Sequence, residues 1–451
     1  MNTPICDFVR QYTESAPVRF HMPGHKGRLA DAADDGPPLY STDITEVEGA
    51  DVLYAARGCI RDSEEHAARL FGSARTLYSA EGSSLCIRAM LYLAVMHARL
   101  RGHRPKIAAG RNAHRVFLET IALLDLDVEW LGSGDELLRA GIDCEKVEAV
   151  FSDEKNAPTA VYVTSPDYLG NRTDLKPIAE LCHRHGALLL VDNAHGAYLK
   201  FLETSEHPLD GGADLCCDSA HKTMPVLTGG AYLHASRNCP DELIGMMERA
   251  MALFASTSPS WLILQSLDAC NALLDADYPE RIQKMAGELD RVKQNLLEQG
   301  WKLTGHEPLK LTFCPKSRGY SGTELAEILQ ESGIVCEFSD PDYLVLMVTP
   351  ENTKEELERL CSVLRELPER ASIMNRAPAT GRPEPVLRPH EVLFHPFERV
   401  PVGESVGKIL ASPGVSCPPA VPIVLCGERI DEKALELFRY YGIKFCDVVK
   451  E

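Results

Sequence analysis

The sequence predicts an α/β fold with a mostly parallel sheet, a smaller α+β domain and a C-terminal accessory domain. Between about residues 75 and 235, short apolar runs alternate with helix-like stretches, which is typical of a parallel sheet covered on both faces. After residue 260 the pattern changes to a long amphipathic stretch and shorter apolar runs, which indicates a second type of domain. The chain has 451 residues, more than one hydrophobic core usually holds, so several domains are expected.

Seven short apolar runs predict the strands of the sheet, with helix-like stretches between several of them. One helix is predicted over residues 83–102, where apolar residues recur near helical spacing, and another over residues 173–186, which ends at Gly186. The predicted strands are residues 75–80, 106–111, 127–132, 160–166, 187–194, 214–220 and 231–236. Ligands on such sheets bind beyond the carboxyl ends of the strands, so those ends are where the chemistry is expected.

Changes of pattern along the chain predict five parts. Residues 279–300 read as a long amphipathic helix, and a helix-like stretch between two apolar runs follows. Residues 376–391 are rich in Pro and Arg, which is typical of a linker, and residues 431–442 predict a final helix. The predicted parts are an N-terminal segment at 1–60, a large domain at 61–265, a small α+β domain at 266–372, a linker at 373–389 and a C-terminal domain at 390–451.

Composition excludes several classes of protein. The net charge of -19 argues against nucleic acid and anionic membranes as partners, because both attract a basic surface. It suits a cationic substrate, although solubility alone also explains it. The 15 cysteines are scattered without a CxxC pair, which predicts reduced thiols in a cytoplasmic protein and no metal site. No signal-like segment or run of about 18 apolar residues occurs, so no membrane anchor is expected.

A turn of small residues follows the first predicted strand. Gly82, Ser83 and Ser84 come directly before a predicted helix, where free N–H groups and hydroxyls offer a site for an anion such as phosphate. Serine is also a common helix cap, and that interpretation stays open.

An aspartate and a lysine follow two other predicted strands of the same sheet. A buried carboxylate at Asp192 needs a cation or donors, or it caps the next turn, and a buried ammonium at Lys222 is costly. Pyridoxal phosphate accounts for both: the lysine amine forms a Schiff base with the aldehyde, and the aspartate keeps the pyridine nitrogen protonated. The small-residue turn then binds the phosphate.

Eight ordered motifs extend this interpretation over nearly the whole chain. The chain resembles the bacterial ornithine/lysine/arginine decarboxylase family of fold type I pyridoxal-phosphate enzymes, in its shorter form without a regulatory wing domain. The motifs are FHMPGHKG (20–27), DITEVEGADVLY (43–54), RNAH (111–114), VTSPDYLG (163–170), VDNAHGA (191–197), SAHKTMPVLTGGAYLH (219–234), STSPS (256–260) and CPPAVPIVLCGERI (417–430).

The resemblance implies a role for each matching residue. Lys222 matches the Schiff-base lysine, Asp192 the partner of the pyridine nitrogen, and His195 a position near the ring's phenolic oxygen. His114 matches the residue that stacks on the ring, although a core or capping histidine is its alternative. The implied phosphate ligands are Ser83, Ser84, Ser219 and His221, with Thr257 reaching over from a neighbouring subunit, so a homodimer or higher homo-oligomer is implied.

Some positions depart from the family pattern. Glu81 stands where the family has Asn or a small residue, Asn193 where it has Glu, and Gly229 where it has Gln. An acid near a dianionic phosphate is unfavourable, so the side chain of Glu81 is expected to point away or meet a cation. His21, His25 and Lys26 belong to a family hallmark near the site, or else to a solvated N-terminal arm.

The predicted function is therefore α-decarboxylation of lysine, arginine or ornithine, giving a polyamine or its precursor. The residues expected to carry the chemistry are Lys222, His221, His114 and Asp192, with Lys222 or His221 returning a proton to Cα. Two alternatives stay open: an aminotransferase or other lyase on the same scaffold, because the protein chooses which bond the cofactor breaks, and a non-catalytic homologue.

A cationic substrate needs an acidic partner for its distal group. Glu337 and Asp340 lie before an apolar run in the second domain, and we expect at least one of them to bind an ammonium or guanidinium. They are three positions apart, so an extended chain would point them to opposite faces. Solvated carboxylates at the start of a strand are the alternative interpretation.

Overall fold

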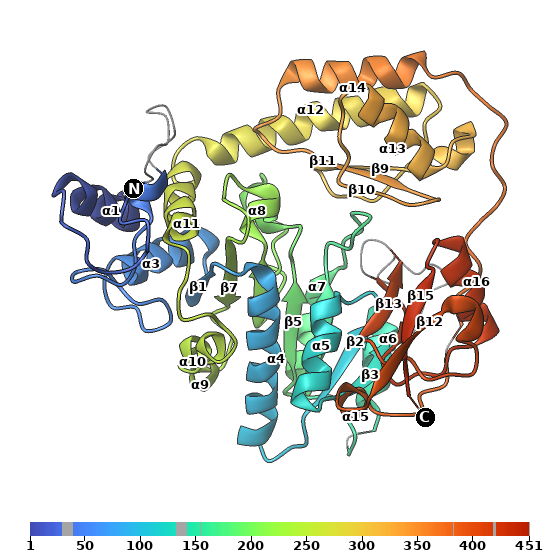
Figure 1. The fold of residues 1–451 in the computed structure, drawn as a ribbon, viewed down its shortest axis with the longest axis horizontal. Helices are drawn as coiled ribbons and strands as arrows, with labels where there is room; N and C mark the ends of the chain where they lie inside the picture. The colour runs from blue at the N-terminus through green and yellow to red at the C-terminus, as the bar shows by residue number, and fades with distance from the viewer. Residues whose placement is uncertain (29–38, 132–141, 154, 382, 418–420, 451) are drawn as a thin grey trace. The chain divides into compact units, whose positions relative to one another are not determined.

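The computed structural model describes residues 1–28, 39–131, 142–153, 155–381, 383–417 and 421–450 (Figure 1). The chain divides into two compact units, one built from Met1–His97 and Leu190–Arg281, the other from Ala98–Leu189 and Ile282–Glu451. Gly132 of a predicted strand, residue 382 of the predicted linker and residues 418–420 of the C-terminal motif lie outside the described residues.

The central sheet confirms the seven predicted strands. Their order is β1-β7-β6-β5-β4-β2-β3. The strands are β1 (Arg75–Ser79), β2 (Lys106–Gly110), β3 (Asp127–Leu131), β4 (Ala160–Thr164), β5 (Leu188–Asp192), β6 (Leu215–Asp218) and β7 (Ala231–Ala235). β2 pairs in parallel with β3 and β4, and β5 with β6, whereas β7 is antiparallel to both β1 and β6. The link from β6 to β7 contains only a one-turn helix, too little for the crossover that a parallel strand needs.

The first unit holds the strand ends that carry Asp192 and Lys222. Its helix α4 starts directly after β1, and its helix α8 directly after Ser219. Buried Asp268 ties the amino-terminal helix to this unit by accepting the backbone N–H groups of Ile5 and Cys6, both at 3.0 Å. The helices are α1 (Pro4–Glu14), α2 (Leu39–Thr42), α3 (Cys59–Phe71), α4 (Gly82–Leu100), η1 (Ala197–Phe201), α8 (Ala220–Thr223), α9 (Asp241–Ile244), α10 (Met247–Ala252) and α11 (Trp261–Leu274).

The second unit contains a further four-stranded antiparallel sheet in the order β10-β11-β9-β8. Helices α12 and α14 lie on the same side of this sheet (Figure 1). Its strands are β8 (Leu303–Thr304), β9 (Lys310–Phe313), β10 (Phe338–Ser339) and β11 (Leu344–Met347). The helices of this unit before residue 370 are α5 (Arg115–Leu124), α6 (Cys144–Phe151), α7 (Leu175–Arg184), α12 (Tyr278–Glu298), η2 (Pro315–Arg318), α13 (Gly322–Glu331) and α14 (Lys354–Glu366).

The C-terminal part of the second unit has two strand pairs and a hydrophobic core that it shares with Leu169, Phe338 and Val345 of the same unit. β12 pairs with β15 and β13 with β14, both antiparallel. Val400, Val424, Phe438 and Val448 are among the buried residues of that core. The elements are α15 (Pro389–Leu393), β12 (Phe397–Pro401), η3 (Val402–Glu404), β13 (Gly414–Cys417), β14 (Val421–Leu425), α16 (Glu432–Tyr440) and β15 (Phe445–Val449). The helix predicted at 431–442 is thus confirmed as α16.

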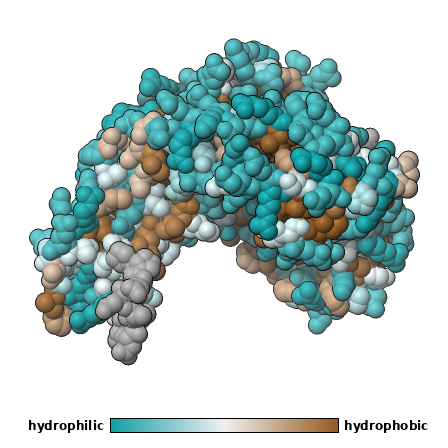
Figure 2. Space-filling model, turned by 90° about the horizontal axis from the view of Figure 1, so that it is seen from above, coloured by the Kyte–Doolittle hydropathy of each residue, from teal (hydrophilic) through white to brown (hydrophobic). Residues whose placement is uncertain are grey.

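Hydrophilic side chains cover most of the face seen in Figure 2, in keeping with the net charge of -19. Among the described residues, no helix combines the length and the apolarity that crossing a bilayer requires.

Candidate active site

Lys222 lies in α8, four residues beyond the end of β6. Its Nζ is 3.1 Å from Nε2 of His195, and its backbone N–H donates to the carbonyl of Ser219 at 3.0 Å. Lys222 is half-buried and His195 is buried. An ammonium has donors only, so a charged Lys222 makes His195 Nε2 the acceptor of this contact.

Asp192 is the last residue of β5 and only 2% exposed. Its Oδ1 accepts the backbone N–H of Ala194 at 3.2 Å and lies 3.7 Å from Sγ of Cys217, the residue opposite it on β6. Burial and then the nearby Asp192 charge raise the pKa of the Cys217 thiol well above its usual value, so the thiol stays protonated and donates. The Oδ1 atom of Asp192 therefore caps the turn that follows β5, as the alternative interpretation expects. The carboxylate itself lies at the end of β5.

The start of α4 brings together the small residues predicted to hold phosphate. Gly82 opens this 19-residue helix at φ +71°, a left-handed conformation that favours glycine. Ser219 Oγ donates to Ser83 Oγ at 2.8 Å, which joins the end of β6 to the first turn of α4. Ser84, in the same turn, is half-buried. Hydroxyls at a helix N-terminus form a donor set that suits a phosphate group.

His221 has both a side-chain and a backbone bond to the residue before β7. Its Nδ1 lies 3.0 Å from the carbonyl oxygen of Gly230, and its backbone N–H donates to the same oxygen at 3.1 Å. A carbonyl only accepts, so Nδ1 carries the hydrogen. In the neutral ring Nε2 then has a lone pair.

Glu81 does turn to a donor, although that donor is uncharged. Its Oε1 accepts the backbone N–H of Ser256 at 2.7 Å. The partner is thus a peptide N–H and not a cation, which was one of the two expected outcomes; whether the side chain points away from the phosphate stays a prediction. The next residue, Thr257, is exposed, and its predicted reach into a neighbouring subunit stays a prediction.

Sequence reasoning missed several polar side chains next to these strand ends. Asp218, Cys217, His207 and His234 are all buried, and Asn193 donates from Nδ2 to Asp218 Oδ1 at 2.7 Å. Asp218 stands directly before the SAHK motif, and this position is a sequence signal that could have identified it. His207 lies in a separate loop, away from the motif in the sequence.

The hallmark histidines of the N-terminal segment bond within that segment. His25 Nε2 lies 3.0 Å from Asp43 Oδ2, and His21 Nε2 lies 2.5 Å from the hydroxyl of Tyr12. The Lys26 ammonium donates to the carbonyl of His21 at 2.5 Å. These contacts lie within the N-terminal segment, and the role of the three residues near the site stays a prediction.

Three predicted site residues belong to the second unit. His114 is exposed and caps α5, where its Nδ1 accepts the backbone N–H of Val116 at 3.2 Å. Glu337 is exposed and accepts from the hydroxyl of Tyr168 at 3.4 Å. Capping is the alternative that the sequence left open for His114, and its role toward a cofactor ring stays a prediction.

Asp340 is buried in the turn between β10 and β11. Its Oδ1 accepts the backbone N–H groups of Asp342 at 2.7 Å and Tyr343 at 2.6 Å. Burial raises its pKa to about 7, although these two hydrogen bonds act in the opposite direction. The side chain is 2% exposed, which differs from the solvated carboxylate that the alternative interpretation describes.

Comparison with known proteins identifies the family. The sequence model described as "Orn/Lys/Arg decarboxylase, major domain" matches residues 3–315. This chain belongs to that decarboxylase family. It is 30% identical over 471 residues to YaaO, an uncharacterized protein of Bacillus subtilis, covering 97% of this chain and 93% of YaaO. It is 29% identical over 466 residues to an arginine decarboxylase of Bacillus subtilis, covering 96% and 92% of the two chains.

Solved structures agree on the fold of this decarboxylase. The Francisella novicida lysine decarboxylase LdcF has a TM-score of 0.81 at 19% identity, covering 99% of this chain and 81% of that one. The E. coli constitutive lysine decarboxylase has a TM-score of 0.79 at 18% identity, covering 100% and 82%. The fold type I prediction is confirmed, and the chain is a carboxy-lyase that depends on pyridoxal phosphate.

The residues of the first unit fit that cofactor. They include an amine, a buried carboxylate and hydroxyls at a helix start, which are groups that the aldehyde, the ring nitrogen and the phosphate of this cofactor would need. The residues that would hold it are Gly82, Ser83, Ser84, Asp192, His195, Ser219, His221 and Lys222.

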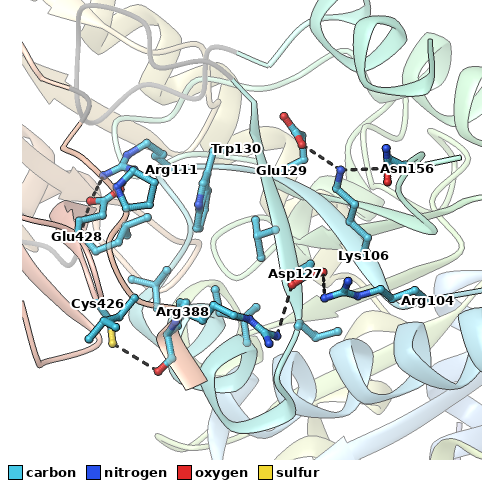
Figure 3. A pocket seen from close by; sticks show the side chains of 18 of the residues that line it. Arg104, Lys106, Arg111, Asp127, Glu129, Trp130, Asn156, Arg388, Cys426 and Glu428 are labelled. Atoms are coloured by element: carbon cyan, nitrogen blue, oxygen red, sulfur yellow. Dashed lines mark hydrogen bonds and ion pairs between the residues drawn. The ribbon is translucent and has the colours of Figure 1, made fainter. Parts of the chain in front are cut away.

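A cavity of about 650 Å³ lies within the second unit of the decarboxylase (Figure 3). It is lined by none of the residues predicted to hold the cofactor, and basic side chains on its wall meet carboxylates. These ion pairs are Arg104–Asp127 at 2.6 Å, Lys106–Glu129 at 3.0 Å and Arg111–Glu428 at 2.6 Å. Much of the charge on the wall is thus neutralised within the wall itself.

Proposed function

We propose that this enzyme removes the α-carboxylate of a basic amino acid, lysine, arginine or ornithine, and so produces a polyamine or its precursor. The observation that carries the proposal is the pairing of Lys222 Nζ with His195 Nε2 at 3.1 Å, in the same unit as a buried carboxylate at Asp192. Relatives named arginine decarboxylase and structural neighbours named lysine decarboxylase support a basic substrate. We place the enzyme in the cytoplasm, because the cysteines whose side chains are described are free thiols.

Each residue has a defined task in this proposal. Pyridoxal phosphate, when bound, provides an electron sink for the pair left on Cα as CO2 departs. The Asp192 carboxylate would hold a proton at the pyridine nitrogen. Ser83 would donate its hydroxyl to the phosphate, and Ser219 would do so once its hydroxyl turns away from Ser83 Oγ. His195 orients the Lys222 amine, which is the Schiff-base group. Lys222, or His221 after it has taken up a proton at Nε2, then delivers the proton that replaces the carboxylate on Cα.

The decisive experiment compares Lys222→Ala with a lysine variant outside the site. Purified wild type should show a visible absorbance band and release CO2 from lysine, arginine or ornithine without forming keto acid. Lys222→Ala should lose the band and the CO2, while Lys200→Ala, which removes a lysine paired with Asp210, should keep both. Keto acid in place of CO2 would favour transamination, and no product from any amino acid would favour a non-catalytic homologue.

We also propose that the active form is a homodimer completed by Thr257. The basis is the exposed position of Thr257 beside Ser256, whose N–H bonds Glu81 directly before Gly82. Dissociation into monomers should release cofactor, and Thr257→Val should weaken cofactor binding to the dimer. A monomer that keeps its cofactor in sedimentation velocity measured by visible absorbance would contradict the proposal.

A further inference from the structure

A buried polar cluster surrounds Asp218 in the first unit. The Asp218 side chain is fully buried at the end of β6, and its Oδ1 accepts from Asn193 Nδ2 at 2.7 Å. Its Oδ2 lies 2.9 Å from Nε2 of His207 and 3.3 Å from Nε2 of His234, and both rings are buried too. A buried carboxylate without such donors would be strongly unfavourable, so these contacts are what allow it to be there.

The hydrogen positions in this cluster follow from the outer partners of the histidines. Nδ1 of His207 accepts the backbone N–H of Leu209 at 3.4 Å, so the ring hydrogen is on Nε2 and faces Asp218. Burial lowers the pKa of His234 and favours its neutral ring. Burial also acts to raise the pKa of Asp218, but the contacts with His207 and His234 outweigh it, so the pKa lies well below its usual value. Asp218 is therefore an anion at working pH.

The cluster is joined to both strand ends that carry the proposed cofactor residues. Asn193 directly follows Asp192, and its backbone N–H donates to the Cys217 carbonyl at 3.0 Å. Its own carbonyl accepts the N–H of Gly196 at 2.8 Å, which closes the turn containing His195. A Cβ placed on Gly196 would come within 2.0 Å of Asn193 Oδ1, so this turn has little room to shift. On β6, Asp218 is followed at once by the segment with Ser219 and Lys222.

We propose that Asp218 is a positioning residue that locks the turn carrying Asp192 and His195 to the segment carrying Ser219 and Lys222. His207 holds the Asp218 carboxylate in place, and Asn193 transmits its position to the turn. The inference rests on the proposed function, since it concerns the geometry of the residues assigned there. None of the three residues touches the reacting atoms.

A metal ion is the competing explanation for this cluster. Ligand atoms of His207, Cys216 and Asp218 lie within 4.8 Å of one another. However, the hydrogen on His207 Nε2 already points to the carboxylate, and burial raises the pKa of the Cys216 thiol well above its usual value. A metal would need both groups deprotonated, so the geometry favours hydrogen bonds.

The test compares Asp218→Asn, His207→Leu and His207→Gln with a control in another buried ion pair. Asp218→Asn removes the charge and leaves one acceptor oxygen for the two donors of Asn193 and His207, and His207→Leu removes the second of these donors. Each should lower kcat about 10-fold to 100-fold with KM little changed, because small displacements of reacting groups have effects of this size. Both should also shift the visible band and weaken binding of pyridoxal phosphate to the apoprotein.

The conservative variant and the control separate positioning from stability. His207→Gln keeps an N–H donor and should lie closer to wild type than His207→Leu in kcat and in the band. Glu64→Gln, in the contact with Arg75 at 3.5 Å, changes another buried carboxylate of the first unit and should leave the band and kcat at their wild-type values. If Asp218→Asn does not fold, Asn193→Ala can replace it, because this variant removes the amide that donates to Asp218.

Three results would overturn the inference. The first is a wild-type band and kcat in Asp218→Asn, in Asn193→Ala or in His207→Leu. The second is equal behaviour of His207→Leu and His207→Gln. The third is about one equivalent of zinc in the purified protein that is absent from Asp218→Asn, since a structural metal would then hold the cluster. Any of these three results would contradict the positioning role of Asp218. The proposed function would still stand, provided that Lys222→Ala loses the visible band.

Discussion

Asp218 in the first unit and Asp340 in the second are both buried aspartates at the end of a strand, yet their environments differ. Asp218 is bonded to an amide and faces two imidazoles, and its pKa is lowered. The Oδ1 of Asp340 accepts two backbone N–H groups, and burial raises its pKa to about 7. The comparison shows that burial alone does not decide the charge of a carboxylate. The side-chain donors gathered around it decide whether it stays ionised.

The difference also separates two uses of an acidic side chain. The contacts of Asp218 reach the neighbours of Asp192 and Lys222, so its charge belongs to a network that fixes other side chains. The Oδ1 atom of Asp340 accepts from the backbone of Asp342 and Tyr343, and these bonds shape one turn. We therefore expect changes in the first unit to alter catalysis, and the change at Asp340 to alter mainly stability.

The largest effect is expected at Asp192. Asp192→Ala should reduce kcat by orders of magnitude, because a neutral pyridine ring is a poor electron sink, whereas Lys222 should still give the visible band. Asp192→Glu should be milder, since it keeps the charge. The measurement is kcat together with the absorbance spectrum. Unchanged kinetics for Asp192→Ala would show that Asp192 only caps its turn. The expectation that changes in the first unit alter catalysis would then be wrong for this residue.

A smaller effect is expected at Glu337, the exposed acid proposed to bind the distal cation of the substrate. Glu337→Gln should raise KM for the basic substrate roughly tenfold, because a hydrogen bond to a charged group contributes about 1.5–3 kcal/mol. Glu358→Gln is the control, because Glu358 is an exposed acid of the same unit, paired with Lys354 in α14. Equal KM values for wild type and Glu337→Gln would place substrate recognition elsewhere.

Asp340→Asn should leave activity unchanged and increase stability in a pH-dependent way. The folded state holds the Asp340 proton up to about pH 7, whereas the unfolded chain releases it near 3.8. Its contribution to stability is therefore complete below pH 3.8 and declines as pH rises to 7, by about 1.4 kcal/mol for each pKa unit of difference.

The amide variant lacks this decline and keeps an Oδ1 acceptor for the turn. Its melting temperature should exceed that of wild type increasingly from pH 4 to pH 7, and by a constant amount above pH 7. Asp218→Asn should instead be less stable than wild type by a nearly constant amount from pH 4 to pH 7. A lowered pKa stabilises the folded state at all pH values above about 3.8, and this stabilisation is lost only as the pH falls below that value. The comparison would be contradicted if the melting temperatures of the two variants, each relative to wild type, changed with pH in the same way.

The smallest effect is expected at Glu81. Glu81→Gln keeps an oxygen to accept the Ser256 N–H and removes a negative charge from the residue before Gly82. Pyridoxal phosphate should bind the apoprotein a few-fold more tightly, because interactions of exposed charges contribute roughly 0.2–1 kcal/mol. The gain should shrink at high salt, and a salt-independent change would point to altered loop structure instead.

Local patterns in the sequence were enough to predict the seven strands and the position of Asp192 at the end of β5. Lys222 was also expected at a strand end, but it lies four residues beyond β6, in the one-turn helix α8. The antiparallel direction of β7 was not predicted, because strand direction depends on pairing across the sheet and not on the run itself. The Asp218 cluster was missed for a similar reason. His207 and Asn193 meet Asp218 only once two loops have folded over β6.

The discontinuous make-up of the two units has a consequence for biosynthesis. Each unit combines an early and a late stretch of the chain, and β1 (Arg75–Ser79) pairs with β7 (Ala231–Ala235). A ribosome adding about 5–20 residues per second needs roughly ten seconds or more to travel from one strand to the other. During that interval a nascent apolar strand lacks its native neighbour and is open to wrong pairing. Supplying chaperones during synthesis should therefore raise the yield of native enzyme.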